Sequence, residues 1–472
     1  MIKNTFLMFS STALRLITGV LLLLLMARIW GAETFGVFMY PFTLAGLIAI
    51  LINYGFNLQI VRDVGKNPQN AHKITCLGLT VKIILTSLVV VLAMGIIPFL
   101  EVLNGYRGIL ALLICANILN SFGMLFNLSL RGMGLFNEEV AITFWFNIVT
   151  LVVIGGLVFL GYGPTAIAFG FVLTKGFFAG LSWLVYRRIM KSPQFILPQL
   201  KELRHSLRTG FPFAIHVALG TLYFQVDTII IQYFMGAEAV GIYQAGLRIM
   251  LAGLILTDVI SNVYMVRMAN ESYDRSQLVI LSTRMTRHCL VFGVIGFVCL
   301  YGFADLVVGL VYGGNYSALI PLFPLFAVVL FLRYLGASYG IILTVADRQL
   351  VRTVAVSLSC VVSVSLNFLL IPHFQLLGAL YASILTHIFL TSIYVVFARR
   401  QVNSWLMDWR SYALILVAVI SGLIYQCLVI EQNMLRVVLL SFVVVLSVGL
   451  GLTLGERKTV LERFSRFFVA TS

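Results

Sequence analysis

GAETFGVF at residues 31–38 returns as GAEAVGIY at residues 236–243, and the match continues without a gap as far as Arg62 and Arg267. Nine of the 32 aligned positions are identical at a constant offset of 205. Because both copies lie in apolar sequence, the repeat predicts two copies of one helical bundle. In membranes, two such halves usually enclose a pathway between them.

The composition places the chain in a membrane. Of its 472 residues, 61% are hydrophobic and 10% are charged, whereas roughly a quarter of a soluble protein is charged. The net charge of +15 would suggest nucleic-acid binding in a soluble protein, but here it indicates Lys and Arg on cytoplasmic loops. The cysteines lie in or beside apolar runs without a CxxC pair, so we expect neither disulfides nor a metal site.

The hydrophobicity is continuous, without period-two alternation, and therefore predicts helices rather than a barrel. About fourteen stretches are long enough to cross a bilayer. They are 5–29, 36–58, 77–100, 108–130, 141–161, 165–186, 211–233, 240–266, 289–312, 319–345, 352–372, 376–398, 411–430 and 436–455. The fold class is thus an all-α polytopic membrane protein.

The basic residues predict the orientation of these spans. With the N-terminus in the cytoplasm, 24 of the 32 Lys and Arg residues lie on the cytoplasmic side or at its ends. The outer side then keeps Arg28, Arg107 and Arg436. Such a bias supports an even number of spans, with both termini in the cytoplasm.

The longest loop between spans, 187–210, is basic and lies at the midpoint of the repeat. We therefore predict an N-lobe at 1–200 and a C-lobe at 201–405, each of six spans. Both lobes enter from the cytoplasm, so a pseudo-two-fold axis along the membrane normal would relate them. Residues 406–472 would add two extra helices and a cytoplasmic basic tail, suited to anionic lipid or simply frayed.

Sequence motifs do not indicate enzymatic chemistry. The chain has no GxxxxGK[ST] phosphate loop and no HExxH, and its GxSxG match, GASYG at 336–340, lies inside the apolar stretch 319–345 rather than at the strand-to-helix turn that the motif requires. No loop concentrates paired carboxylates for acid–base work. We therefore expect no cofactor and no enzyme, but a transporter driven by an ion gradient or the membrane potential.

Charged residues inside the spans are functional candidates, because each costs a few kcal/mol to insert. They are Arg15, Lys82, Lys175, Asp227, Arg248, Asp258 and Arg333. We expect Lys82 to extend to the cytoplasmic surface. Asp227 and Arg248 would pair between consecutive spans, and Asp258 would meet basic loop residues.

Arg15, Lys175 and Arg333 lie near mid-membrane without an obvious partner, and His387 occupies the position equivalent to Lys175. If these groups face the space between the lobes, they form a cationic cavity to which Arg248 would add. Such a cavity suits a ligand bearing phosphate or pyrophosphate. Alternatively, each cation bonds backbone carbonyls inside its own lobe.

The second half carries candidates for ion coupling or gating. His216, Gly220, Tyr223 and Asp227 follow one helical face and would suit a proton relay. Asp258 and His387 are further candidates, although a structural role fits each of these groups too. We predict no Asp or Glu within the spans of the first half, so the first lobe would hold an anionic cargo and the second would couple ions.

Several features together resemble the polysaccharide transporter family. They are the two six-span halves plus two spans, the mid-membrane Arg15, the GAE-x-x-G-[VI]-[FY] turn after spans one and seven, and Val61-Arg62-Asp63. That family includes Wzx-type flippases and belongs to the multidrug/oligosaccharidyl-lipid/polysaccharide exporter superfamily.

The resemblance implies a flippase of O-antigen, lipopolysaccharide or related polysaccharide biosynthesis. Its cargo would be an undecaprenyl-pyrophosphate-linked oligosaccharide, moved across the bacterial inner membrane by alternating access as an antiporter. The two last spans would fit a groove for the lipid tail. Membrane lipids, a polysaccharide polymerase and a chain-length regulator are the implied contacts.

Three alternatives are open. A lipid II flippase would also have a cationic cavity. A multidrug extruder of the same fold would favour an acidic cavity and usually has twelve spans. A membrane glycosyltransferase or polymerase would need a large loop with catalytic residues, and no loop here is long enough.

Overall fold

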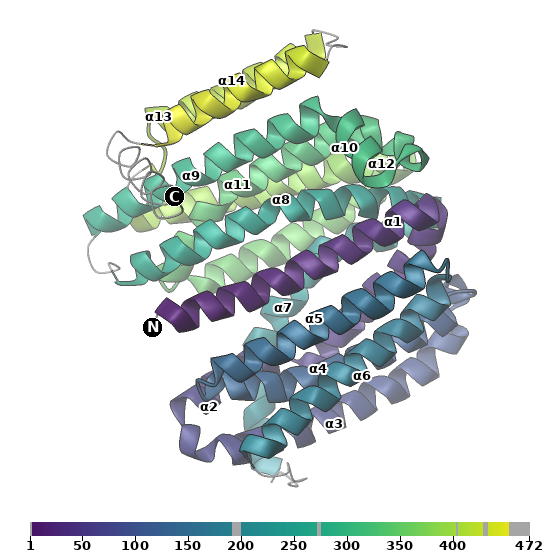
Figure 1. Cartoon of the computed structure of the whole chain (residues 1–472). Helices are drawn as coiled ribbons and strands as arrows, with labels where there is room; N and C mark the ends of the chain where they lie inside the picture. Colours follow the sequence, from purple (N-terminus) through teal and green to yellow (C-terminus); the bar gives the residue numbers. More distant parts are fainter. Residues whose placement is uncertain (1, 191–199, 271–274, 403–404, 428–432, 453–472) are drawn as a thin grey trace, which may run out of the picture. The chain divides into compact units, whose positions relative to one another are not determined.

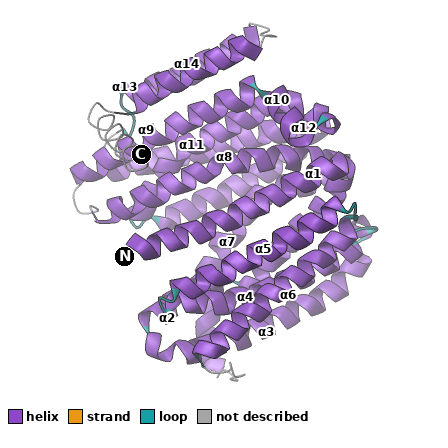
Figure 2. Cartoon of the chain, viewed as in Figure 1, coloured by secondary structure: helices purple, strands orange, loops and turns teal. Residues whose placement is uncertain are grey.

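The computed structural model describes residues 2–190, 200–270, 275–402, 405–427 and 433–452 (Figure 1). These residues are helical apart from short turns, and no strand occurs among them (Figure 2). The all-helical membrane fold predicted from hydrophobicity is confirmed. The predicted basic tail lies outside the described residues.

The N-terminal compact unit is Met1–Ala245. Its main helices are α1 (Ile2–Asn53), α2 (Phe56–Lys66), α3 (Ala71–Ile96), α4 (Arg107–Gly132), α5 (Phe136–Phe159), α6 (Pro164–Ile189) and α7 (Leu200–Met235). A buried apolar cluster of α2 to α6 includes Leu125, Phe146 and Phe178. This core fixes α4, α5 and α6 against one another, and these helices position the candidate site.

The C-terminal compact unit is Gly246–Ser472. It holds most of α8 (Ala237–Asn270), followed by α9 (Arg275–Gly302), α10 (Ala304–Tyr312), α11 (Phe323–Val345), α12 (Gln349–Val402), α13 (Trp409–Cys427) and α14 (Asn433–Gly451). The boundary between the compact units falls inside α8. The division into lobes at residue 200, which rests on the repeat, stays a prediction.

Glycines with positive φ open both copies of the repeat. Gly31 lies inside α1 with φ 75° and ψ 176° and separates the first two predicted spans. Gly236, its equivalent, has φ 84° between α7 and α8. Side chains rarely tolerate these angles, so glycine is favoured at both turns. At Gln375, which has φ 54°, a similar break divides α12 into the eleventh and twelfth predicted spans.

The first residues of the two copies of the repeat also cross each other inside the N-terminal unit. A Cβ on Gly36 would lie 1.7 Å from the carbonyl oxygen of Ala237, and one on Gly241 would lie 1.8 Å from that of Ala32. Ala32 and Gly36 are the repeat equivalents of Ala237 and Gly241. The contact is therefore reciprocal, and its Ala-xxx-Gly spacing is that of closely packed membrane helices.

Eleven helices among the described residues are long and apolar enough to span a membrane. One of them, α12, contains two predicted spans, and α1 contains the first predicted span and most of the second, which continues into α2. The ninth predicted span, 289–312, is wrong at both ends, because α9 runs from Arg275 to Gly302 and a separate short helix follows.

The two extra helices, α13 and α14, pack on α9 and are joined to the rest of their unit by ion pairs. Asp408 precedes α13, accepts hydrogen bonds from Ser411 N at 2.9 Å and Oγ at 2.7 Å, and lies 3.1 Å from Arg287 Nη1 of α9. Arg436 of α14 donates to both carboxylate oxygens of Asp305 at 2.8 and 2.7 Å. Burial acts to raise the pKa of Asp408, but the Ser411 hydrogen bonds and the Arg287 charge hold that pKa below its ordinary value.

Candidate functional site

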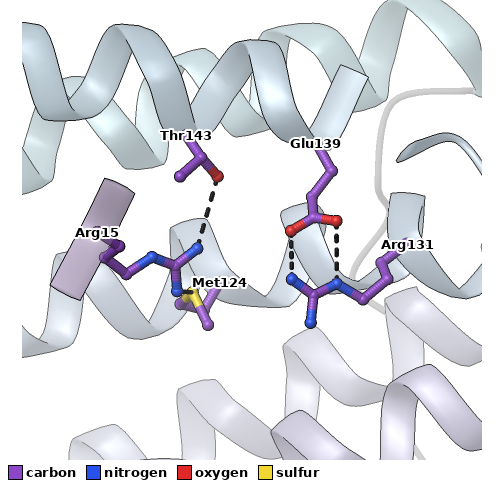
Figure 3. A network of polar contacts seen from close by, with 5 residues as sticks. All are labelled: Arg15, Met124, Arg131, Glu139 and Thr143. Atoms are coloured by element: carbon purple, nitrogen blue, oxygen red, sulfur yellow. Dashed lines mark hydrogen bonds and ion pairs between the residues drawn. The ribbon is translucent and has the colours of Figure 1, made fainter. Parts of the chain in front are cut away.

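Arg15 lies in the first half of α1 and reaches two neighbouring helices (Figure 3). Its Nη1 lies 3.7 Å from Met124 Sδ on α4, and its Nη2 lies 3.5 Å from Thr143 Oγ1 on α5. Both acceptors are neutral, and both contacts are long for hydrogen bonds. Among the described residues, no carboxylate lies within salt-bridge distance of Arg15. Its guanidinium is therefore only weakly satisfied by its own unit.

Lys175, from α6, reaches the same two helices. Its Nζ donates to Asn120 Oδ1 on α4 at 3.1 Å and lies 4.6 Å from the ring centroid of Phe146 on α5. An amide oxygen and an aromatic face attract an ammonium without neutralising it. The contacts of Lys175 therefore leave the positive charge of its ammonium form without a neutralising carboxylate.

The contacts place Arg15 and Lys175 close together. Asn120 and Met124 are one helical turn apart on α4, and Thr143 and Phe146 are one turn apart on α5. The two cations thus rest on the same pair of helices about one turn, roughly 5–6 Å, apart. Their charges are close enough to act on each other.

A third cation nearby is neutralised. Arg131, at the end of α4, donates from Nε to Glu139 Oε2 at 3.0 Å, and its Nη2 contacts Oε1, so the pair is bidentate (Figure 3). Glu139 is fully buried in the first turn of α5. The prediction that the first half has no acidic residue within its spans is therefore wrong, because α5 begins five residues before the predicted span at 141–161.

The arrangement in the N-terminal unit is suited to binding an anion. Arg15 and Lys175 present five and three N–H donors respectively, and their acceptors are neutral. Glu139 lies one turn before Thr143, the contact of Arg15, but Arg131 already takes both of its oxygens. An incoming oxyanion would therefore find donors that no carboxylate already occupies.

The corresponding groups of the C-terminal unit have a different environment. Arg333 of α11 lies near Asp258 of α8 and His387 of α12, close enough for their charges to interact. His387 Nδ1 lies 2.8 Å from the carbonyl oxygen of Ser383. The expectation that Asp258 meets basic loop residues is replaced by this proximity to Arg333.

Other predicted coupling residues lie elsewhere. Asp227 is buried in α7 and accepts a hydrogen bond from Tyr243 Oη at 2.7 Å. Arg248 lies near Tyr312 in the C-terminal unit. Asp227 and Arg248 belong to different units, so their pairing stays a prediction. The side chain of His216 lies outside the described residues.

The prediction that Lys82 extends to the cytoplasmic surface is wrong. It is 0% exposed, and its Nζ lies 2.7 Å from both the carbonyl oxygen and Oγ of Ser121 on α4. It lies eleven residues into α3, about 16 Å along the helix axis, and bends into the unit instead of reaching the surface. Asparagines on other helices provide the polar environment that a local sequence window does not reveal.

Metal binding finds no support in the part of the chain that the structure describes, where no group of three His, Cys, Asp or Glu residues is placed to hold an ion.

Comparisons with known proteins give a family and a fold. A model of the family described as polysaccharide biosynthesis protein matches residues 1–265. A Haloferax volcanii protein described as probable low-salt glycan biosynthesis flippase Agl15 is 24% identical over 370 residues, covering 76% of this chain and 75% of the relative.

Solved structures share the fold at low identity. The lipid II flippase MurJ in an inward closed conformation has a TM-score of 0.72 at 13% identity, covering 95% of this chain and 98% of that one. An inward-facing multidrug resistance MATE family transporter of the MOP superfamily has a TM-score of 0.68 at 15% identity, covering 81% and 94%. Both likenesses concern the fold alone.

Proposed function

Because this chain belongs to the polysaccharide biosynthesis protein family, we propose that it is a flippase for a lipid-linked glycan precursor. The cargo is an oligosaccharide carried on undecaprenyl pyrophosphate, destined for O-antigen or a related surface polysaccharide. It moves from the inner to the outer leaflet of the bacterial inner membrane. The protein alternates between inward- and outward-open states, coupled to an ion gradient, and makes or breaks no covalent bond in the cargo.

The observation that carries this proposal is the Arg15–Lys175 pair. Pyrophosphate offers several anionic oxygens, which suit a bidentate guanidinium and a point-charge ammonium about one helical turn apart. In a membrane, two cations held by neutral acceptors are expensive, and a function that uses their charge explains their retention. A multidrug extruder for cations would gain nothing from them.

Lipid II flipping is the second candidate, since its cargo carries the same pyrophosphate and the MurJ likeness extends over nearly the whole chain. The two functions differ in the consequence of losing the protein. Without a lipid II flippase cell-wall synthesis stops, whereas without a surface-polysaccharide flippase the cells grow but lack the polymer. Deletion in the native host therefore separates them.

The test is complementation of that deletion by Arg15→Ala, Lys175→Ala and Arg333→Ala at matched protein levels. We expect surface polysaccharide to fall about tenfold or more for Arg15→Ala and Lys175→Ala, because each removes a charge-assisted contact of about 1.5–3 kcal/mol. Arg28→Ala, on an exposed arginine of the same helix as Arg15, is the matched control. Wild-type polymer from all three variants would refute the cationic site.

A further inference from the structure

Lys82 lies in a cage of oxygen atoms contributed by three other helices. Besides the two oxygens of Ser121, its Nζ lies 3.3 Å from Asn53 Oδ1 of α1 and 3.4 Å from Asn57 Oδ1 of α2. Ser121 Oγ also donates to Asn53 Oδ1 at 2.8 Å. One side chain of α3 therefore joins α1, α2 and α4.

The cage holds the ammonium without a counter-ion. Among the described residues of α1, α2 and α4, the side chains that face Lys82 are Asn53, Asn57 and Ser121, and none of them titrates. No charged group in the described chain acts on it.

The titratable groups on the packed elements have their own contacts elsewhere. On α2, Arg62 pairs with Asp63, and on α3 His72 contacts Cys76 and Tyr186. The described polar contacts of Lys82 are therefore those of the cage.

Two opposing effects act on the protonation of Lys82 at such a site. Burial away from water favours the neutral amine, while four oxygen dipoles favour the ammonium. The ammonium has three hydrogens to donate, whereas the amine has two and turns a lone pair towards oxygens of which only the Ser121 hydroxyl can donate, and that hydroxyl already donates to Asn53. Loss of the proton therefore weakens the connection among four helices.

The cage is joined to the cargo site through α4. Ser121 accepts hydrogen bonds from Lys82, and the residue directly before it, Asn120, accepts one from Lys175. Met124, one turn further on, contacts Arg15. At Gly123, α4 packs so closely on α6 that a Cβ would lie 2.5 Å from Phe178. A shift of α4 would therefore displace a contact of each cargo cation.

We propose that Lys82 is a proton-binding site that couples the pH gradient to transport, with α4 carrying the effect to Arg15 and Lys175. The coupling part rests on the flippase function proposed above. In each cycle the Lys82 amine takes a proton on its lone pair from one side of the membrane, and the ammonium N–H bond later returns that proton to the other side. Sodium does not suit this cage, because Nζ already occupies its centre and no carboxylate faces it.

The first experiment counts protons without cargo. Purified wild type and Lys82→Met are taken from about pH 9 to about pH 5, the range in which buried lysines titrate, and proton uptake is measured with an indicator dye. We expect Lys82→Met to take up one proton fewer per chain. Lys73→Met, an exposed lysine of the same helix, should match the wild type. Equal uptake by wild type and Lys82→Met would overturn the proposal.

A second variant covers a failure of Lys82→Met to fold. Lys82→Arg keeps the charge and the donors but does not release its proton, so it should also lose one proton of uptake. Ser121→Ala retains the lysine while removing one acceptor, so uptake should persist but occur at lower pH. Uptake in Lys82→Arg equal to that of the wild type would again refute the site.

The third experiment tests coupling in proteoliposomes with fluorescently labelled undecaprenyl diphosphate as the probe. A pH gradient should accelerate flipping by the wild type, and it should leave the rate of Lys82→Met and Lys82→Arg unchanged while both still bind the probe. A gradient response in either variant equal to the wild type's would overturn the coupling. If the wild type neither binds nor flips the probe, the proposed function fails, and the proton count still decides whether Lys82 titrates.

Discussion

The two compact units differ in the partners of their cations. In the N-terminal unit Arg15 and Lys175 rest on neutral acceptors. In the C-terminal unit Arg287 and Arg436 each pair with an aspartate, and Arg333 lies near one. Both units are all-helical, so the shared helical architecture does not decide the charge balance. That contrast makes the N-terminal unit the better candidate for holding an anion.

The Arg131–Glu139 ion pair is the place where a cation of the N-terminal unit is neutralised by a carboxylate, as in the C-terminal unit, and its loss gives the largest expected effect on stability. Glu139→Gln leaves the Arg131 charge in the protein without its partner, which should destabilise the fold by about 3 kcal/mol. Thermal unfolding in detergent measures this. Glu138→Gln, the adjacent carboxylate, is the control. An unchanged melting temperature for Glu139→Gln would remove the pair as a structural element.

Substitution of the cations in each unit tests whether the N-terminal unit, rather than the C-terminal unit, binds the anionic cargo. The double variant Arg15→Ala/Lys175→Ala should lower the rate of probe flipping by about 100-fold or more, since two charge-assisted contacts of about 1.5–3 kcal/mol each are lost. Arg333→Ala should cost less, because Asp258 already offsets part of its charge. The double variant Arg28→Ala/Lys73→Ala removes two exposed cations as a control. If Arg333→Ala proved the more damaging, the assignment of the cargo site to the N-terminal unit would be reversed.

The reciprocal crossing predicts equal effects from the two copies of the repeat. Gly36→Ala and Gly241→Ala each force a Cβ into a backbone oxygen, so each should destabilise by about 1–3 kcal/mol. Gly46→Ala, on the same helix as Gly36 but with open space around it, should be neutral or slightly stabilising. Thermal unfolding compares the three. A large effect at one glycine and none at the other would show that the contact is not reciprocal in solution.

The smallest effect concerns Asp408 in the C-terminal unit. Its pKa is held below the ordinary value in the folded protein, so it contributes stability above the unfolded pKa of about 4 that is lost as pH falls through that region. Asp408→Asn should therefore lower stability at neutral pH by less than about 1 kcal/mol. The melting temperatures of variant and wild type should converge below about pH 4. A constant difference across this pH range would contradict the ionised Asp408–Arg287 pair.

Most of the fold could be predicted from hydropathy and the repeat, because lipid demands long apolar helices. The ends of the ninth span could not be predicted in this way. Arg284 and Arg287 lower the hydropathy near the true start of α9, and the aspartate that pairs with Arg287 comes from beyond α12. A charge neutralised by a residue more than a hundred positions away leaves no mark in a local window.

The residues of the candidate site are predictable from the sequence, but their contacts with residues far along the chain are not. Arg15 and Lys175 stood out as charges inside spans, although their common position on α4 and α5 needed the structure. Glu139 was missed because it lies just outside the predicted span. The position of Lys82 differs from the prediction because its oxygen cage comes from three other helices, whereas a lysine near a helix end usually extends to the membrane surface.

The crossing of Gly36 on Ala237 and of Gly241 on Ala32 joins two backbones with hardly any side-chain atoms between them. Separating them requires no rotamer change and exposes little apolar area. What holds them is dispersion between backbones, and a gap of about 0.5–1 Å already forfeits a quarter to a half of each contact. The energy of the crossing therefore falls steeply as the two backbones separate, and few intermediate separations have low energy.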